Sequence, residues 1–98
     1  MLKTEAYRRT EHGSKYLQQL CKHFAHKVEV EFTPTEGKAA MPMGPALMRA
    51  DADGLWVEVT GADAESLERA KGAIDRHLAK FAFREEFEHM PWQEPVSA

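Results

Sequence analysis

The spacing of hydrophobic residues along the chain changes twice, and each change marks a different kind of element. Between residues 14 and 27 the apolar positions follow the 3.6-residue period of a helix. They are Leu17, Leu20, Cys21 and Phe24. Since neither proline nor a β-branched residue interrupts this stretch, it predicts an amphipathic helix at about 11–26, with Thr10 or Ser14 as its N-cap.

From Val28 the apolar residues alternate with polar ones, which is the period of a strand with one solvated face. Val28, Val30 and Phe32 are the apolar members of this first strand. Shorter stretches of the same kind predict strands at about 38–42, 46–50 and 55–59. Turn residues at 33–37 and 51–54 divide this region, and connections this short imply antiparallel pairing.

Helical spacing returns after Gly61. Asp63 is a good N-cap for a second helix at about 63–80. The apolar stripe of this helix consists of Leu67, Ala70, Ile74, Leu78 and Phe81. Gly72 lies in the middle of the helix, where it costs about 1 kcal/mol relative to Ala, so we expect it to allow close approach of another backbone.

Together these elements predict a single α+β domain over residues 1–98. Its antiparallel sheet has about four strands, and the two amphipathic helices pack on one face of it. Residues 3–9 form either an extra N-terminal edge strand or a frayed end, and residues 1–3 and 91–98 are expected to be irregular tails. The predicted core contains Leu17, Leu20, Cys21, Phe24, Leu67, Ile74, Leu78 and Phe81.

The composition argues against disulfide-rich, membrane-spanning and nucleic-acid-binding proteins. A single cysteine excludes an intrachain disulfide framework, and no apolar run reaches the ~18 residues of a membrane helix. With no signal-peptide pattern at its N-terminus, the protein is expected in the cytoplasm and away from membranes. A sequence pI near 5.9 argues against nucleic acid as a partner.

Charge is distributed unevenly. Residues 1–27 carry a net charge of +4 and residues 28–98 a net charge of −7. This asymmetry fits a surface for a small anion or an acidic partner protein. The simpler interpretation, which we favour, is that the basic segment packs beside its acidic remainder and the two fields partly cancel.

The polar face of the first helix has an unusual composition. His12, Tyr16, Gln19, His23 and His26 cluster within about 80° of arc. Solvated faces normally carry Glu and Lys, so this face predicts a binding surface for an anionic ligand, a metal chelate or a partner; the alternative is an ordinary solvated face. His77 lies at the margin of the second helix's apolar stripe, where a histidine either bonds to a nearby carbonyl or carboxylate or joins a site.

Cys21, His23 and His26 fall within six residues, which invites a metal interpretation. A helix places Cys21 about 160° from His23, so only His23 and His26, at i and i+3, are placed to share a metal. Cys21 then belongs to the core, and the alternative is a thiol nucleophile with a histidine as its base. No phosphate-binding glycine loop, nucleophile elbow or His-Glu-x-x-His helix is present.

Trp56 is expected on the sheet face opposite Leu55 and Val57. It predicts either an apolar patch suited to a homodimer or a surface covered by the C-terminal tail. The patch would include Met41, Met43 or Met48, and the covering side chain would be Trp92 or Phe87.

Two segments, residues 16–27 (YLQQLCKHFAHK) and residues 77–86 (HLAKFAFREE), occur with turns at Gly37 and Asp53–Gly54 and a late Trp92. In this combination the chain resembles, over roughly residues 3–93, a small bacterial family called domain of unknown function 2218. The resemblance implies a stand-alone protein of about this length and no established activity. It also implies a link to iron, because some members are associated with siderophore-interacting ferric reductases.

The family's segments map onto Cys21, His23, His26, His77, Phe81, Phe83, Arg84 and Glu85. Around Met41–Leu47 the chain departs from the family's pattern, in which a second cysteine often occurs, and this puts any two-thiol chemistry in doubt.

Three functional hypotheses remain. The first is a non-enzymatic accessory module, connected with iron or siderophores, that holds a small anionic ligand, a metal chelate or a protein partner. Its ligand-binding residues would be His12, Tyr16, Gln19, His23, His26, His77 and Arg84, with His23 and His26 as metal ligands. The second is a small thiol- or metal-dependent enzyme that uses Cys21 with a histidine. The third is a homodimeric structural protein.

Overall fold

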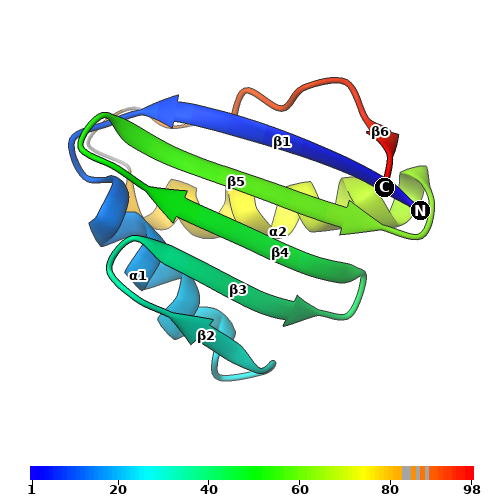
Figure 1. The fold of residues 1–98 in the computed structure, drawn as a ribbon, viewed down its shortest axis with the longest axis horizontal. Helices are drawn as coiled ribbons and strands as arrows, with labels where there is room; N and C mark the ends of the chain where they lie inside the picture. The colour runs from blue at the N-terminus through cyan, green and yellow to red at the C-terminus, as the bar shows by residue number, and fades with distance from the viewer. Residues whose placement is uncertain (83–84, 86, 88) are drawn as a thin grey trace.

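The computed structural model describes residues 1–82, 85, 87 and 89–98. Six strands form one antiparallel sheet in the order β2-β3-β4-β5-β1-β6 (Figure 1). The strands are β1 (Leu2–Arg9), β2 (Val30–Phe32), β3 (Glu36–Met41), β4 (Gly44–Ala50), β5 (Gly54–Gly61) and β6 (Val96–Ser97). The helices are α1 (Gly13–Phe24) and α2 (Ala64–Phe81).

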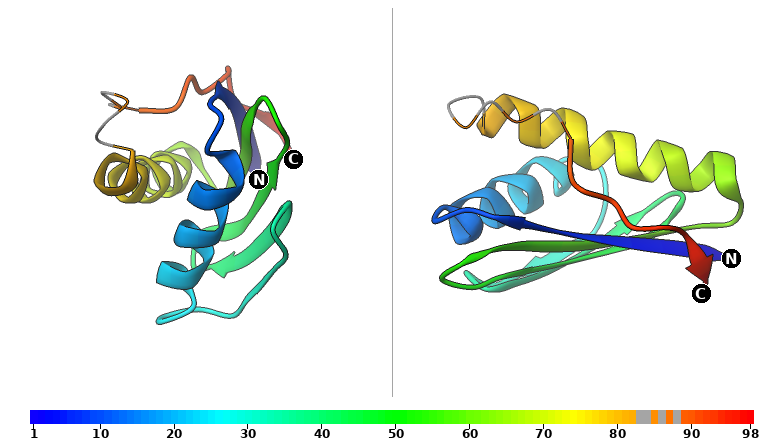
Figure 2. Two further views of the ribbon diagram at one scale, coloured as in Figure 1. Left: turned by 90° about the vertical axis from the view of Figure 1, so that its left-hand side faces the viewer. Right: turned by 90° about the horizontal axis from the view of Figure 1, so that it is seen from above.

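Both helices lie on one face of the sheet (Figure 2). In the part of the chain that the structure describes, no helix covers the opposite face, which we call the outer face. The predicted α+β architecture is therefore confirmed. None of the described helices is both long enough and apolar enough to cross a membrane.

The sheet has six strands instead of about four because both ends of the chain join it. β1 pairs with β5 along its whole length, from Leu2 opposite Gly61 to Arg9 opposite Gly54, and β6 pairs with its first residues. The N-terminal segment is thus an interior strand, and residues 2–3 and 96–97 lie in strands instead of irregular tails. The buried residues of β1 are Thr4 and Ala6. Because both are small, the sequence of β1 shows little of the hydrophobic alternation that predicts a strand.

The first strand of the central region is shorter than its pattern predicts. β2 covers only Val30–Phe32, and the side chain of Phe32 is 39% exposed instead of buried. Its cross-strand neighbour is Gly37, which has no side chain to cover it, and no strand lies beyond β2 in the described part of the sheet.

The helix starts differ in how they are capped. Asp63 caps α2 as predicted, because its side chain accepts a hydrogen bond from Ser66 N at 2.8 Å. α1 begins after His12, which makes no side-chain cap bond, so neither Thr10 nor Ser14 is the N-cap. Thr10 Oγ1 instead accepts from His12 N at 3.1 Å, just before the helix.

The core lies between the helices and the inner face of the sheet. Seven of the eight expected core residues are buried, and the eighth, Phe81, is only half-buried. Trp56 faces outward as expected, but Met48 is buried, and Met41 and Met43 pack partly buried against the core. The expected patch of Trp56 with methionines is therefore absent from the outer face that the structure describes.

The C-terminal segment returns along α2 to the edge of β1. Asp75 accepts hydrogen bonds from Met90 N at 2.9 Å and from Trp92 Nε1 at 3.0 Å. Gln93 then donates through its backbone N–H to Glu5 O. Trp92 is thus bonded to α2, and Phe87 lies against Arg8, so neither covers Trp56.

Two glycines give opposite predictions for substitution by alanine. A Cβ on Gly54 would collide with the backbone oxygen of Arg8 and the ring of Tyr7, whereas a Cβ on Gly72 would meet only the flexible end of the Arg76 side chain. Gly72 therefore makes no close approach to another backbone, contrary to expectation. Gly54→Ala should lower the free energy of unfolding by roughly 1–3 kcal/mol, and Gly72→Ala should raise it by about 0.5–1 kcal/mol. Urea unfolding curves of both variants test this, and a destabilised Gly72→Ala would contradict it.

Candidate functional site

A groove of about 500 Å³ runs between α1 and the C-terminal end of α2. α1 supplies one wall because residues three or four apart share a helix face. The end of α2 and Glu85 supply the other wall. The lining residues are His12, Lys15, Tyr16, Gln19, Lys80, Phe81 and Glu85.

The inner end of the groove is built on Tyr16 and Glu85. Tyr16 is only 4% exposed, and its hydroxyl donates a hydrogen bond to Glu85 Oε2. Thr10 Oγ1 donates to the same carboxylate oxygen at 3.1 Å. The guanidinium of Arg8, on β1, lies 3.8 Å from Glu85 Oε1. These contacts tie β1, α1 and the segment after α2 together around one carboxylate.

The surroundings of Tyr16 keep its phenol protonated. Burial, followed by the hydrogen bond and the negative charge of Glu85, raises the pKa of Tyr16 to about 12. The phenol therefore remains a hydrogen-bond donor to Glu85 even at alkaline pH values at which an ordinary tyrosine ionises.

Two buried polar atoms near this cluster form no hydrogen bond with any described residue. They are Gln19 Oε1 and Arg8 Nε. A buried acceptor without a donor is costly, and Gln19 lines the groove.

The mouth of the groove is cationic. Lys15 and Lys80 are exposed on opposite walls, and neither forms an ion pair with a residue that the structure describes. His12, which also lines the groove, has Nε2 3.9 Å from Glu11 Oε1. Phe81 adds an apolar side chain to the lining.

A cluster of aromatic and imidazole rings continues from the groove along α1. The ring of His23 lies 5.0 Å from that of Phe81 and 5.8 Å from that of His77, measured between centroids. His77 also packs against Phe24, and its Nδ1 lies 2.7 Å from Ala73 O. His26 is exposed, with its ring 6.5 Å from His23.

The family model described as an uncharacterized protein conserved in bacteria (DUF2218) matches residues 5–93. The chain belongs to this family. The NMR structure of PA4090 from Pseudomonas aeruginosa is similar, with a TM-score of 0.81 and 31% identity over 99% of this chain and 100% of that chain. None of the curated proteins compared with the chain matches it.

The structure divides the expected site residues of this DUF2218 protein into two groups. His12, Tyr16 and Gln19 line the groove, whereas His23 and His77 stand beside it and His26 lies further along α1. Tyr16 was expected on a solvated face but is buried, and only its hydroxyl reaches the polar cluster. Arg84 lies outside the described residues.

The histidines do not form a complete metal centre in the described part of the chain. No group of three or more His, Cys, Asp or Glu residues there is arranged to hold a metal ion. His23 and His26 supply two imidazoles, and a tetrahedral site would take its other ligands from outside this set.

Cys21 occupies the core of the DUF2218 fold. Its side chain is fully buried, and a Cβ on Gly37 of β3 would lie 2.7 Å from its Sγ, so the sulfur fills the space left by that glycine. Burial raises the pKa of the Cys21 thiol to about 11. No described histidine forms a hydrogen bond with this thiol, so its surroundings do not activate it as a nucleophile.

Four groove residues were not in the predicted site: Lys15, Lys80, Phe81 and Glu85. Lys15 shares the predicted face of α1 but resembles an ordinary solvated lysine. The other three come from the end of α2 and the segment after it. Their approach to α1 depends on tertiary packing, which the spacing of residues within either helix does not reveal.

Proposed function

We propose that this DUF2218 protein is a binding module that holds a small hydroxycarboxylate, or a metal chelate of one, in the groove between α1 and α2. The observation that carries the proposal is the pairing of two cations at the mouth with an unsatisfied acceptor inside. Lys15 and Lys80 suit the carboxylates of such a ligand, and Gln19 Oε1 suits its hydroxyl.

The guanidinium of Arg8, 3.8 Å from Glu85 Oε1, offsets part of the negative charge that Glu85 would present to such a ligand. Lys15 and Lys80 are the more exposed charges, so a ligand meets them first on entering. Phe81 lies against the carbon skeleton of the bound molecule.

Binding, and not turnover, is the function that these residues support. The groove contains hydrogen-bond donors, an acceptor and two ammonium groups, while the single thiol is buried in the core with a raised pKa. The link to iron that the family resemblance implies enters this proposal only through the metal chelate as a ligand. A metal held by the ligand's own oxygens needs no complete set of protein ligands.

NMR titration tests the proposal with three probes. Citrate should cause saturable amide shifts around Lys15, Gln19 and Lys80. Tricarballylate, which is citrate without the hydroxyl, should bind more weakly because it leaves Gln19 Oε1 unsatisfied. Gallium(III) citrate, a diamagnetic substitute for the ferric complex, shows whether the chelate is preferred to the free acid.

Variants locate the binding. Lys15→Ala/Lys80→Ala should weaken citrate binding by about tenfold. The control Lys22→Ala/Lys27→Ala removes two exposed charges from the same part of the chain outside the groove and should bind nearly as the wild type does. Equal losses in the two double variants, or no saturable shift with any probe, would contradict the proposal.

A further inference from the structure

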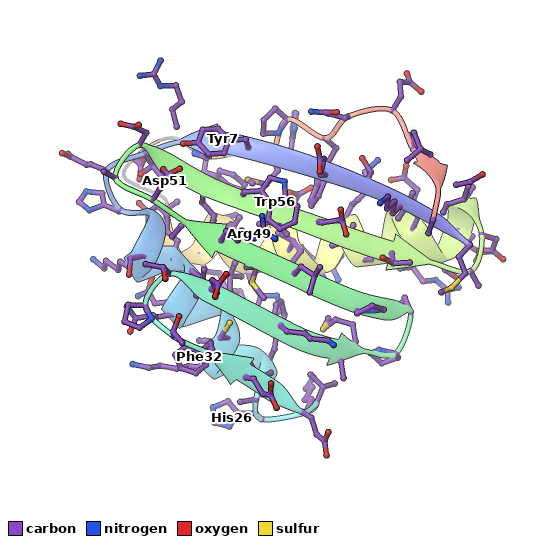
Figure 3. All side chains as sticks on the ribbon, in the orientation of Figure 1. Tyr7, His26, Phe32, Arg49, Asp51 and Trp56 are labelled. Atoms are coloured by element: carbon purple, nitrogen blue, oxygen red, sulfur yellow. The ribbon has the colours of Figure 1, made fainter. Side chains whose placement is uncertain are left out.

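The outer face of the sheet gathers residues that are typical of protein interfaces. Tyr7, Arg49 and Trp56 project from three adjacent strands and line a hollow of about 420 Å³ (Figure 3). The guanidinium of Arg49 lies 4.9 Å from the centroid of the Trp56 ring. Tyr, Trp and Arg are the residue types most enriched among those that dominate binding energy at interfaces.

Charges on this face follow the register of the strands. Lys38 of β3 lies opposite Leu47 of β4, which lies opposite Glu58 of β5, which lies opposite Glu5 of β1. One row therefore runs from a cation to two carboxylates. Neither Lys38 nor Arg49 forms an ion pair with any residue that the structure describes.

We propose that the outer face is the interface of a homodimer, in which two copies pack with their outer faces together. The two-fold axis lies between the two packed sheets, runs parallel to the strands and passes over the line between β4 and β5. This axis places the β3 of each copy against the β1 of the other, and each β4 against the other's β5. Lys38 then meets Glu5 of the second copy, twice by symmetry, and Glu58 lies against Leu47 of that copy. Arg49 meets Trp56 of the second copy in the same way. The carboxylate of Glu5 also accepts a hydrogen bond from Trp56 Nε1 of its own chain at 3.2 Å.

Lys38 and Glu5 of one chain do not interact with each other, because β4 and β5 separate their strands. Strands lie ≈ 4.8 Å apart, so the two side chains start about 14 Å from each other. Only a second copy brings these opposite charges together. Packed sheets also cross at about 30°, and the long side chains of Lys38 and Glu5 accommodate the displacement that this rotation causes near the centre of the crossing.

A specific dimer would use most of the outer face. The molecule measures 32 × 26 × 20 Å, and the outer face spans the two longer dimensions (Figure 1). A standard interface takes about 800 Å² from each partner, which is close to the whole of this face. The groove lies on the helix side, so the dimer leaves it open and the two proposals are independent.

Sedimentation equilibrium with charge-reversed variants tests the dimer. The wild type should self-associate at concentrations up to about 1 mM. Lys38→Glu places two carboxylates together at each contact, and Glu5→Lys places two ammonium groups together. Either variant alone should self-associate at least about 100-fold more weakly than the wild type.

Mixing the two variants shows whether each substitution weakens self-association at the interface itself or by disturbing the fold of the single chain. In a mixed pair, Glu at position 38 meets Lys at position 5, and the native Lys38 meets the native Glu5, so both contacts are complementary. An equimolar mixture should regain dimers, while the control Lys22→Glu, on the helix side, should dimerise as the wild type does. A monomeric wild type, or a mixture that stays monomeric, would overturn the proposal.

Discussion

Leu20→Ala should lower the free energy of unfolding by about 2–5 kcal/mol. Leu20 is fully buried in the middle of α1, where it faces the core. Truncation removes three carbons from a close-packed interior and leaves a cavity that the surrounding strands cannot fully close. Since small domains are stable by only about 5–15 kcal/mol, this is a large fraction of the total.

Urea unfolding followed by circular dichroism measures the effect, with Val96→Ala as the control. Val96 is also a branched aliphatic residue, but it is 53% exposed at the edge of the sheet, so its truncation should change stability by less than about 0.5 kcal/mol. A Leu20→Ala protein as stable as the control would show that the apolar stripe of α1 does not face the core.

The parts of the fold that the sequence predicts best are those in which one element carries its own signal. The stripe of α1 and the Asp63 cap of α2 are local patterns, and both are confirmed. β1 has no comparable signal, because its buried residues Thr4 and Ala6 are small and one is polar. Its place between β5 and β6 comes from pairing with residues more than 40 positions away.

In the candidate site, too, the sequence predicts what is local to one helix and misses what depends on packing between elements. The helical period groups His12, Tyr16 and Gln19 on one face, and the structure places all three on the groove. Lys80 and Glu85 reach the groove only because α2 packs beside α1, which no spacing within a helix can indicate. The burial of Tyr16 follows from the same packing, since the partner that receives its hydroxyl lies 69 residues further along the chain.

The second large effect should appear at alkaline pH, where the protein should lose stability steeply between about pH 9 and pH 12. Two buried groups resist ionisation in the folded state. The pKa of Cys21 rises from 9.0 to about 11, and that of Tyr16 rises from 10.0 to about 12. Above its ordinary pKa each group ionises in the unfolded chain but stays protonated in the folded one.

The sign of the effect follows from proton counting. Because the folded protein then binds more protons than the unfolded chain, each rise in pH favours unfolding. The contribution of each group is fully present below its ordinary pKa and is lost as the pH rises through the folded value. A pKa that is higher by one in the folded protein than in the unfolded chain corresponds to about 1.4 kcal/mol of stability, so the two groups together account for roughly 5 kcal/mol.

Variants of the two groups separate this effect from the titration of surface lysines. Cys21→Ala and Tyr16→Phe each remove one of the buried ionisable groups. Both variants should be less stable than the wild type at about pH 8, and both should lose stability less steeply between about pH 9 and pH 11. Denaturation curves measured at closely spaced pH values, with a reductant to keep the thiol reduced, give these slopes. Parallel pH profiles for all three proteins would show that neither buried proton contributes, whereas a flatter profile in each variant assigns the alkaline loss to the core thiol and to the phenol beside the groove.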